Sequence, residues 1–401
     1  MTVKREGVAG AAAGFPPASR RLRLGMVGGG PGSFIGPIHA NGARLSGRWE
    51  IVAGALSSRP DIARQAGRDW FLAEDRSYGD YREMAEREAA RHDGIDAVAI
   101  TTPNHTHYPI ARAFMERGID VISDKPVTTT LADALDLVEL QRRTGLVFGV
   151  TYTYTGSAMV RQARQMIAEG AIGAVRQVHV EYFQDWAMNV TDAWRLDRSK
   201  SGASFTTADI GTHAHYLACF VIGREMTALR AEFHVSGAPK PLEDTAFMQV
   251  RYGDIPGTLL VSQAAAGTEC GLRIRVFGDK GGLEWDQENP EYLRFSAVGG
   301  PPQILSRGLG AGIGSEASRF VRMPRGHPEA LTDAWANLYT EFGVAVLARR
   351  EGTVLPDGLL RYPTVRDGAE GVAFVEAAVK SAAEGGVWVD CSLPSDAGPS
   401  P

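Results

Sequence analysis

Residues 22–36, which read Leu-Arg-Leu-Gly-Met-Val-Gly-Gly-Gly-Pro-Gly-Ser-Phe-Ile-Gly, join an apolar run of strand length to a cluster of glycines. Apolar residues at helical spacing follow as far as Leu45. A strand, a glycine turn and a helix in this order form the context of a dinucleotide-binding fingerprint. Glycines let the backbone approach a pyrophosphate closely, and the helix N-terminus attracts its negative charge. The stretch therefore predicts an α/β domain of the Rossmann type with NAD or NADP as cofactor.

The glycine turn departs from the plain G-x-G-x-x-G spacing. Gly28 and Gly30 fit the pattern, but the sixth position is Ser33. Gly36 then stands as a displaced third glycine, with residues 31–33 as an insertion. The expected cofactor contacts of this turn are Gly28, Gly30, Gly32, Ser33, Phe34 and Ile35. The alternative is an ordinary glycine turn between a strand and a helix.

Length and composition limit the possible classes of protein. A chain of 401 residues with 44% hydrophobic and 22% charged residues is typical of a soluble globular protein with two domains. The net charge is -5 without a basic block, so no nucleic-acid partner is expected. Apolar runs are too short to span a membrane. Three widely separated cysteines suit a reducing compartment.

The two ends of the chain are expected to be disordered tails, residues 1–20 and 395–401. Arg20 and Arg21 could belong to a twin-arginine export signal, but a glycine-interrupted strand follows them instead of an apolar core. We therefore expect a cytoplasmic protein.

Strands alternate with helices as far as Val150, which predicts a doubly wound parallel sheet over residues 21–150. Ligands of such sheets bind at the carboxyl ends of the strands. Three further polar clusters stand at predicted strand ends. They are Ser57, Ser58 and Arg59; Thr102, Pro103, Asn104 and His107; and Asp124 with Lys125. All of these residues are candidate cofactor contacts.

The cluster Ser57-Ser58-Arg59 lies where an NAD site usually carries an acid that binds the ribose 2′-hydroxyl. Two hydroxyls and a guanidinium suit a 2′-phosphate instead, which favours NADP. The competing interpretation is a plain loop in which Ser58 caps the helix that begins near Pro60.

Residues 151–394 form the second predicted domain. A helix over 160–169 and one over 209–220 accompany several extended runs that are separated by short turns, which predicts a large, mostly antiparallel sheet. Residues 299–314 are rich in Gly and Pro and are predicted to form a mobile loop.

Two features point to chemistry on a hydroxyl group. Lys125 before Pro126 can stabilise a developing alkoxide, although a lone lysine is more often a surface residue. Asp209 and His213 are four residues apart on one helix face, where the carboxylate can orient an imidazole base. A helix-surface pair, or a cap with a core histidine, is the simpler explanation. The pair lacks a third ligand of similar spacing, so no metal is expected.

Together these motifs resemble the Gfo/Idh/MocA oxidoreductases, over roughly residues 22–390. The resemblance is carried by Gly36-Pro37-Ile38-His39, Thr102-Pro103-Asn104 with His107, Asp124-Lys125-Pro126, Trp194-Arg195, and Asp209 with His213. It implies a Rossmann domain followed by an α/β domain with an open sheet that often forms oligomer contacts. We therefore expect a homo-oligomer, a dimer or a tetramer. Asp124 stands where the family usually has Glu.

The resemblance also implies hydride transfer between NAD(P) and a secondary hydroxyl of a sugar, sugar derivative or cyclitol. Lys125 and His213 are then catalytic, and Asp209 supports His213. The substrate-binding candidates are Tyr154, Trp186, Trp194, Arg195 and His213. Tyr152, Gln184 and His215 are weaker candidates. Some relatives use the bound cofactor transiently for glycoside cleavage or elimination, and this remains an alternative. A non-catalytic nucleotide-sensing protein is the other.

Overall fold

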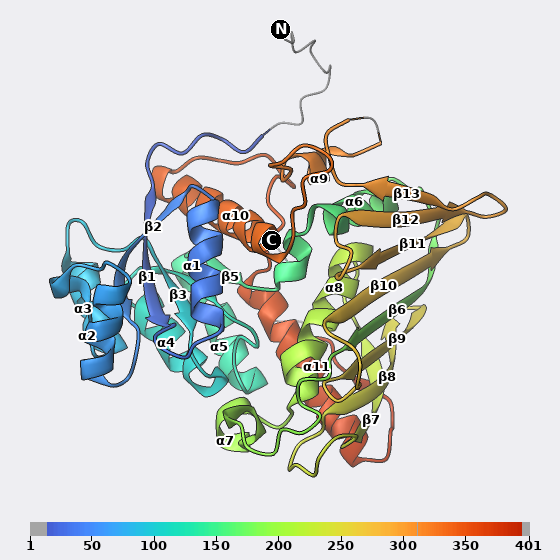
Figure 1. The fold of residues 1–401 in the computed structure, drawn as a ribbon, viewed down its shortest axis with the longest axis horizontal. Helices are drawn as coiled ribbons and strands as arrows, with labels where there is room; N and C mark the ends of the chain where they lie inside the picture. The colour runs from blue at the N-terminus through green and yellow to red at the C-terminus, as the bar shows by residue number, and fades with distance from the viewer. Residues whose placement is uncertain (1–13, 311, 395–401) are drawn as a thin grey trace, which may run out of the picture.

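A computed structural model describes residues 14–310 and 312–394, which form a five-stranded and a nine-stranded sheet side by side (Figure 1). The smaller sheet contains β1 (Leu22–Gly28), β2 (Trp49–Ala55), β3 (Ala97–Thr101), β4 (Asp120–Ser123) and β5 (Phe148–Val150). All of its strand pairs are parallel, in the order β2-β1-β3-β4-β5. The predicted doubly wound sheet is therefore confirmed.

The connections of the smaller sheet are helical, as alternation with strands predicts. They are α1 (Ile35–Leu45), α2 (Pro60–Asp69), η1 (Glu74–Arg76), α3 (Tyr81–Ala90), η2 (Asn104–Thr106), α4 (His107–Met115) and α5 (Leu131–Thr144). Local sequence sets several boundaries. Asp80 and Thr130 cap α3 and α5 by accepting hydrogen bonds from backbone N–H groups, and Gly145 ends α5 in a left-handed conformation.

The larger sheet has the order β13-β12-β11-β10-β6-β9-β8-β7-β14. Its strands are β6 (Val175–Phe183), β7 (Ala228–His234), β8 (Thr245–Tyr252), β9 (Ile255–Ser262), β10 (Gly271–Gly278), β11 (Gly281–Asp286), β12 (Tyr292–Ala297), β13 (Gln303–Ser306) and β14 (Val389–Asp390). Within the described part of this larger sheet, the β6–β9 pair is parallel and the other strand pairs are antiparallel. The predicted large, mostly antiparallel sheet is thus confirmed.

Helices cover one face of the larger sheet and leave the other open (Figure 1). The helical segments after residue 150 are η3 (Thr153–Gly156), α6 (Ala158–Ala168), η4 (Trp194–Leu196), α7 (Arg198–Ser201), η5 (Thr207–Gly211), α8 (Thr212–Ile222), α9 (Ser315–Ser318), α10 (Leu331–Glu351) and α11 (Val365–Ala383). Along β8 buried and exposed side chains alternate, as expected for a strand with one covered face.

Helix α10 lies far along the chain but completes the Rossmann part. Trp335, Tyr339 and Phe342 of α10 pack with Leu24 and Trp49 in one buried cluster. The Trp49 indole also donates a hydrogen bond to the Tyr339 carbonyl at 2.8 Å. The first sheet therefore gains one of its covering helices from a segment about 180 residues after its last strand, and the two-part organisation is discontinuous in sequence.

Two expectations about irregular segments differ from the structure. The predicted mobile loop at 299–314 is wrong for Gln303–Ser306, because β13 pairs there with β12 as a hairpin. Of the tail predicted at 1–20, residues 1–13 lie outside the described residues, as do 395–401. The rest makes contacts: Phe15 packs on Phe320, and Arg20 donates two hydrogen bonds to Asp96 at 2.7 and 2.8 Å.

Candidate active site

The glycine turn has the shape that a pyrophosphate cradle requires. A Cβ atom built on Gly30 would lie 2.3 Å from the Leu56 carbonyl oxygen, and one on Gly36 would lie 2.2 Å from the Gly29 Cα. Both approaches are possible only for glycine, so Gly36 fills the role of the displaced third glycine. Ser33 accepts a hydrogen bond from the Gly36 N–H at 3.1 Å, and Phe34 immediately precedes α1. The turn and the α1 N-terminus fit a dinucleotide.

The loop after β2 contains the three residues that are predicted to determine whether NAD or NADP is preferred. Ser58 and Arg59 are exposed and Ser57 is half-buried. The N-cap of α2 is Arg59, with Pro60 at the first helical position and no side-chain capping bond. The competing interpretation of Ser58 as a helix cap is therefore wrong. Arg59 is paired only with its neighbour Asp61, at 3.2 Å, among the ion pairs of the described residues.

The cluster after β3 divides into accessible and buried residues. Thr102 is half-buried and Pro103 is exposed, whereas Asn104 and His107 are buried. The two ring nitrogens of His107 lie 2.8 Å from the carbonyl oxygens of Pro126 and Thr102. His107 therefore ties the segments after β3 and β4 together, and its own ring is covered by protein.

Lys125 and Asp209 meet across 84 positions of sequence. The Lys125 ammonium donates to the Asp209 carboxylate Oδ1 at 2.7 Å and to the Asp209 main-chain carbonyl at 2.6 Å. Asp124 stands beside them and accepts from the Lys125 N–H and the Thr151 hydroxyl, both at 2.9 Å. The Lys125 charge is thus fixed at the carboxyl edge of the parallel sheet, where cofactor and substrate are expected.

A π-helical turn, η5, carries Asp209. The Thr212 N–H bonds to the Thr207 carbonyl, five residues back, and α8 begins only at Thr212. The π-turn changes the direction of Asp209 relative to the next helical turn, and such turns are frequent at functional sites. No hydrogen bond joins Asp209 to His213 among the described residues. The spacing of the two residues predicts that Asp209 orients His213, but in the structure the Asp209 carboxylate is paired with Lys125 instead.

His213 is surrounded by aromatic rings next to the Lys125–Asp209 ion pair. Its ring centroid is 5.0 Å from that of Tyr154 and 6.1 Å from that of Tyr152, in edge-on geometry. Nδ1 is buried and has no hydrogen-bond partner in the described part of the chain. Burial, together with the nearby Lys125 charge and against the opposing influence of Asp209, holds the pKa of His213 well below its usual range. His213 is therefore neutral at neutral pH.

Asp209 remains ionised in spite of its position. Burial acts to raise its pKa, but the charges of Lys125 and Arg195 and the hydrogen bonds from Lys125 and Gln263 lower it well below the usual range. Arg195 Nε lies 3.6 Å from Asp209 Oδ2, and its guanidinium stacks on Trp194 at 4.6 Å. The predicted pair Trp194-Arg195 therefore stands at the site.

Two glutamines at the site are not among the main candidates that the sequence indicates. Gln263, directly after β9, donates to Asp209 Oδ2 at 2.8 Å. Gln184, directly after the parallel neighbour β6, accepts from the Trp186 indole at 3.0 Å and donates to the Tyr182 hydroxyl at 3.2 Å. Gln184 was only a weak candidate and Gln263 was none. The register of β6 with β9 was the missing information, because it brings the ends of both strands together.

The other candidates for the substrate differ in accessibility. Trp186 is 44% exposed and packs edge-on against Phe205, whereas the Tyr154 side chain is buried and its hydroxyl is hydrogen-bonded to that of Tyr182. The weak candidate His215 is buried in a stack on Phe374, with ring centroids 4.7 Å apart. His215 is thus a core residue.

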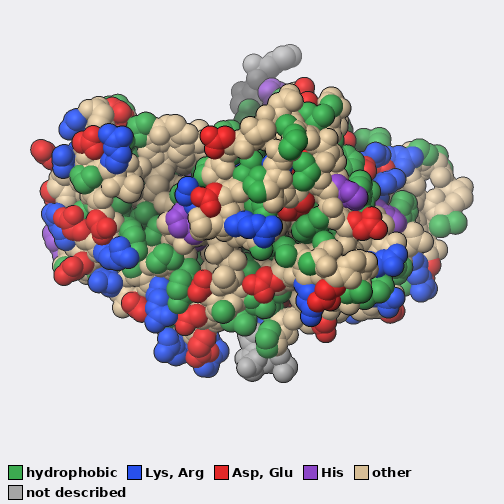
Figure 2. All heavy atoms as spheres, turned by 90° about the horizontal axis from the view of Figure 1, so that it is seen from below, with side chains coloured by type: hydrophobic (Ala, Val, Ile, Leu, Met, Phe, Trp, Pro, Cys, Tyr) green, Lys and Arg blue, Asp and Glu red, His purple; other side chains and the backbone are tan. Residues whose placement is uncertain are grey.

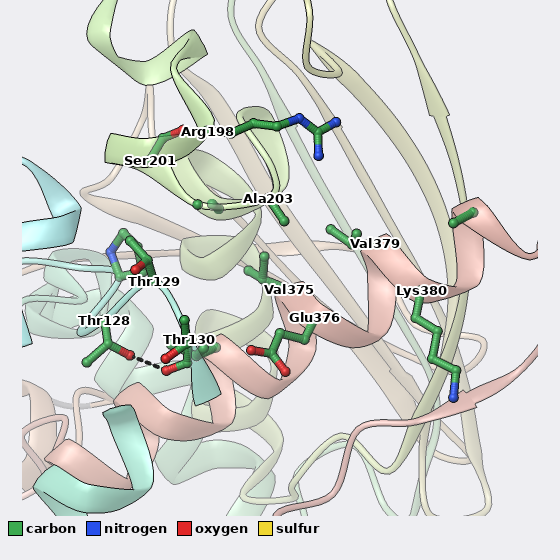
Figure 3. A pocket seen from close by; sticks show the side chains of 15 residues that line it. Thr128, Thr129, Thr130, Arg198, Ser201, Ala203, Val375, Glu376, Val379 and Lys380 are labelled. Carbon is green, nitrogen blue, oxygen red and sulfur yellow. Dashed lines mark hydrogen bonds between the residues drawn. The ribbon is translucent and has the colours of Figure 1, made fainter. Parts of the chain in front are cut away.

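A cavity of about 550 Å³ lies close to the site but is distinct from it (Figure 3). Pro126 and Ala208, the neighbours of Lys125 and Asp209, line one part, and Val375 and Val379 of α11 line another. Lys125, Asp209 and His213 are not among its lining residues.

The surface seen from below shows Lys and Arg interspersed with Asp and Glu, without a basic patch over that face (Figure 2).

No helix in residues 14–310 and 312–394 has the length and hydropathy needed to cross a membrane.

The fold and the glycine turn are those of an oxidoreductase with an NAD-binding Rossmann domain. Residues 22–152 match the family model of the oxidoreductase family with the NAD-binding Rossmann fold, and residues 160–284 match that of the GFO/IDH/MocA C-terminal domain. The chain belongs to the Gfo/Idh/MocA oxidoreductases, whose relatives include enzymes named for sugars and cyclitols.

Three relatives show the extent of the similarity. The uncharacterized oxidoreductase YfiI of Bacillus subtilis is 34% identical, covering 93% of this chain and 97% of the relative. An oxidoreductase from Sinorhizobium meliloti is 45% identical, with a TM-score of 0.84, over 92% of this chain and 99% of that chain. An inositol dehydrogenase homolog from Azotobacter vinelandii, solved with NADH and myo-inositol, is 39% identical, with a TM-score of 0.86, over 93% and 98%.

Proposed function

We propose that this protein oxidises a secondary hydroxyl of a sugar, sugar derivative or cyclitol, or reduces the corresponding ketone, with a nicotinamide cofactor. The observation that carries the proposal is the Lys125–Asp209 ion pair beside His213, at the carboxyl edge of the sheet that carries the glycine turn. The Azotobacter relative solved with NADH and myo-inositol supports the substrate class.

The bound nicotinamide supplies a hydride acceptor or donor. In the oxidative direction the carbinol C–H bond breaks as hydride, the O–H bond breaks as a proton, and a C=O bond forms. The charge that develops on the oxygen is stabilised by the Lys125 ammonium. His213, held neutral by burial and by the Lys125 charge, accepts the proton. Asp209 keeps the ammonium in place by its carboxylate and by its main-chain carbonyl.

The segment between β6 and α7 supplies side chains that suit a polyol ring. Trp186 and Trp194 offer apolar faces, and Arg195 offers N–H donors, which suits a ring with apolar faces and many hydroxyls. Tyr154 contributes through its contact with His213.

We also propose NADP(H) binding at least as tight as that of NAD(H). Ser58 and Arg59 are exposed after β2, and Arg59 has only the neighbouring, exposed Asp61 as an ion-pair partner among the described residues. A guanidinium in this position recognises a phosphate in bidentate fashion.

We further propose that the chain self-associates through the open face of the nine-stranded sheet. This face exposes Phe247 and Phe277, and Trp388 is exposed next to Arg251 at the edge that carries β14. Light scattering after gel filtration should give a mass of at least two chains, and Phe247→Asp with Phe277→Asp should reduce it to one. An unchanged mass in the double variant would place the interface elsewhere.

The deciding experiment incubates the protein and each cofactor with a panel of inositols, sugars and glycosides, following nicotinamide absorbance and product mass together. Net cofactor reduction with a product two mass units lighter supports the dehydrogenase. Release of an aglycone without net change of the cofactor would favour redox-assisted cleavage instead. Reaction with 2-hydroxy acids or amines, and with none of the polyols, would reject the carbohydrate assignment.

A further inference from the structure

Gln263 is fully buried and makes hydrogen bonds at both ends of its carboxamide. Its Oε1 accepts from the Thr206 hydroxyl at 2.8 Å, and its Nε2 donates to Asp209 Oδ2 at 2.8 Å. An ionised carboxylate only accepts hydrogen bonds, so Asp209 must face the NH₂ end of the amide, and the Thr206 hydroxyl then donates to the Oε1 end. The donor group therefore points at the carboxylate without an alternative orientation.

Each carboxylate oxygen of Asp209 has its own hydrogen-bond donor. Oδ1 accepts from Lys125, and Oδ2 accepts from Gln263, while Arg195 stands further away at 3.6 Å. Rotation of the carboxylate away from Lys125 would break the bond to Gln263, which cannot follow because Thr206 holds it. The amide nitrogen of Gln263 also lies 3.5 Å from Gln184 Oε1, to which it donates its second hydrogen bond, and this contact links it to the substrate side of the site.

We propose that Gln263 is a positioning residue that holds the Asp209 carboxylate ionised and directed at Lys125. The proposal rests on the proposed function for its catalytic consequence, but the placement of Asp209 is a property of the protein alone. Gln263 touches no reacting atom; it acts through Asp209 on the charge that stabilises the alkoxide.

The groups that face Asp209 come from four elements. Lys125 follows β4, Arg195 belongs to η4, His213 to α8, and Tyr154 to η3. Of these, Lys125 and Arg195 favour the ionised carboxylate, and burial opposes it. Loss of the neutral donor Gln263 favours the protonated form of Asp209. A new carboxylate at position 263 favours the protonated form still more.

The test compares Gln263→Leu and Gln263→Glu with Gln65→Glu, which adds the same charge at an exposed glutamine of α2. In Gln263→Leu we expect kcat to fall about tenfold to a hundredfold, KM to stay within about twofold, and the loss of activity on acidification to begin at a higher pH than in the wild type, because Asp209 then takes up a proton more readily and titrates in addition to His213. In Gln263→Glu the new carboxyl resembles the amide only when protonated. Its activity should therefore recover on acidification, unlike that of Gln263→Leu.

A second measurement does not depend on substrate or cofactor. Urea unfolding of the protein without cofactor, from pH 2 to pH 7, should show that Gln263→Leu destabilises more at pH 6 than at pH 2. The reason is that the depressed folded pKa of Asp209 contributes stability above the unfolded pKa, and this contribution is lost only as the pH falls toward the depressed folded value. Thr206→Val, which removes the hydroxyl that orients the amide, should shift the acid limb in the same direction.

Wild-type kcat in Gln263→Leu, or a destabilisation that is the same at pH 2 and pH 6, would overturn the proposal and leave Gln263 a packing residue. If no polyol is oxidised by the wild-type protein, the proposed function fails, whereas the unfolding comparison still decides the role of Gln263. A Gln263→Leu variant that does not fold leaves the decision to Thr206→Val: an unshifted acid limb there also overturns it.

Discussion

The Lys125 ammonium nitrogen lies 2.7 Å from Asp209 Oδ1 and 2.6 Å from the main-chain carbonyl oxygen of the same residue. One residue thus binds the lysine through both its side chain and its backbone. Asp209 is consequently the partner that determines where the lysine charge stands.

Lys125→Ala is expected to lower turnover by about a hundredfold or more, because the charge that stabilises the alkoxide is removed. Cofactor affinity should change much less. Steady-state kinetics and a nicotinamide fluorescence titration measure the two effects separately. Lys200→Ala, at an exposed lysine of α7, is the matched control and should behave as wild type. Near-full activity of Lys125→Ala would reject the assignment of the lysine.

His213→Ala is expected to lower kcat about a hundredfold, because the variant lacks the base that accepts the proton of the substrate hydroxyl. In the wild-type protein the pKa of His213 lies well below 6.5, so protonation should reduce the rate only well below pH 6.5. A pH–rate profile from pH 4 to pH 9 measures this limb. His92→Ala, at an exposed position after α3, serves as the histidine control. A limb centred at pH 6.5 or above in the wild type would contradict the buried, neutral state.

Arg59→Ala is expected to weaken NADP(H) binding about tenfold or more, while NAD(H) binding stays within about twofold, because the guanidinium meets only the 2′-phosphate. Fluorescence titration of both reduced cofactors gives the two ratios. Arg64→Ala, at an exposed position of α2, controls for the loss of a positive charge. At least tenfold tighter NAD(H) in the wild type, unaffected by Arg59→Ala, would show that the protein prefers NAD.

Acid should destabilise the fold through its buried histidines. Burial lowers the pKa of His39 to about 4 and that of His215 to about 3, and the unfolded chain titrates near 6.5. The unfolded state therefore binds more protons below pH 6.5, and each histidine removes about 2 kcal/mol of stability by pH 5. Glu370 opposes this in part: burial raises its pKa to about 8, so its contribution is greatest at low pH and declines between about pH 4.5 and 8.

The measurement is the free energy of urea unfolding at pH 5 and pH 7. His215→Phe should flatten this dependence by about 2 kcal/mol, since an aromatic ring keeps the stack on Phe374 without a titrating group. An unchanged pH dependence in this variant would mean that His215 is not buried in its neutral form.

Phe15→Ala is expected to lower the melting temperature by several degrees, because the ring packs in a small cluster with Phe320 and Ala317. Arg20→Ala should do likewise, as it leaves the buried Asp96 with fewer donors. Arg21→Ala, at an exposed neighbour, is the control. Melting temperatures equal to the wild type would show that residues 14–20 contribute nothing to the fold.

Much of the architecture could be predicted from local pattern. The glycine turn, the alternation of strands and helices up to Val150 and the short turns of the second half are each properties of neighbouring residues, and each predicted the correct class of structure. The hairpin of β12 and β13 was missed because its strands are short and one lies within a Gly- and Pro-rich segment.

The sequence by itself determined which residue types stand at strand ends, since periodicity and turn chemistry act over a few positions. Only the tertiary structure decided their partners. Asp209 and His213 are four apart in sequence, yet a π-turn and the charge of Lys125 direct the carboxylate elsewhere. Gln263 reaches the site through the register of β6 with β9, and α10 joins the first sheet by packing. Contacts between distant segments depend on how whole elements pack, which no local pattern encodes.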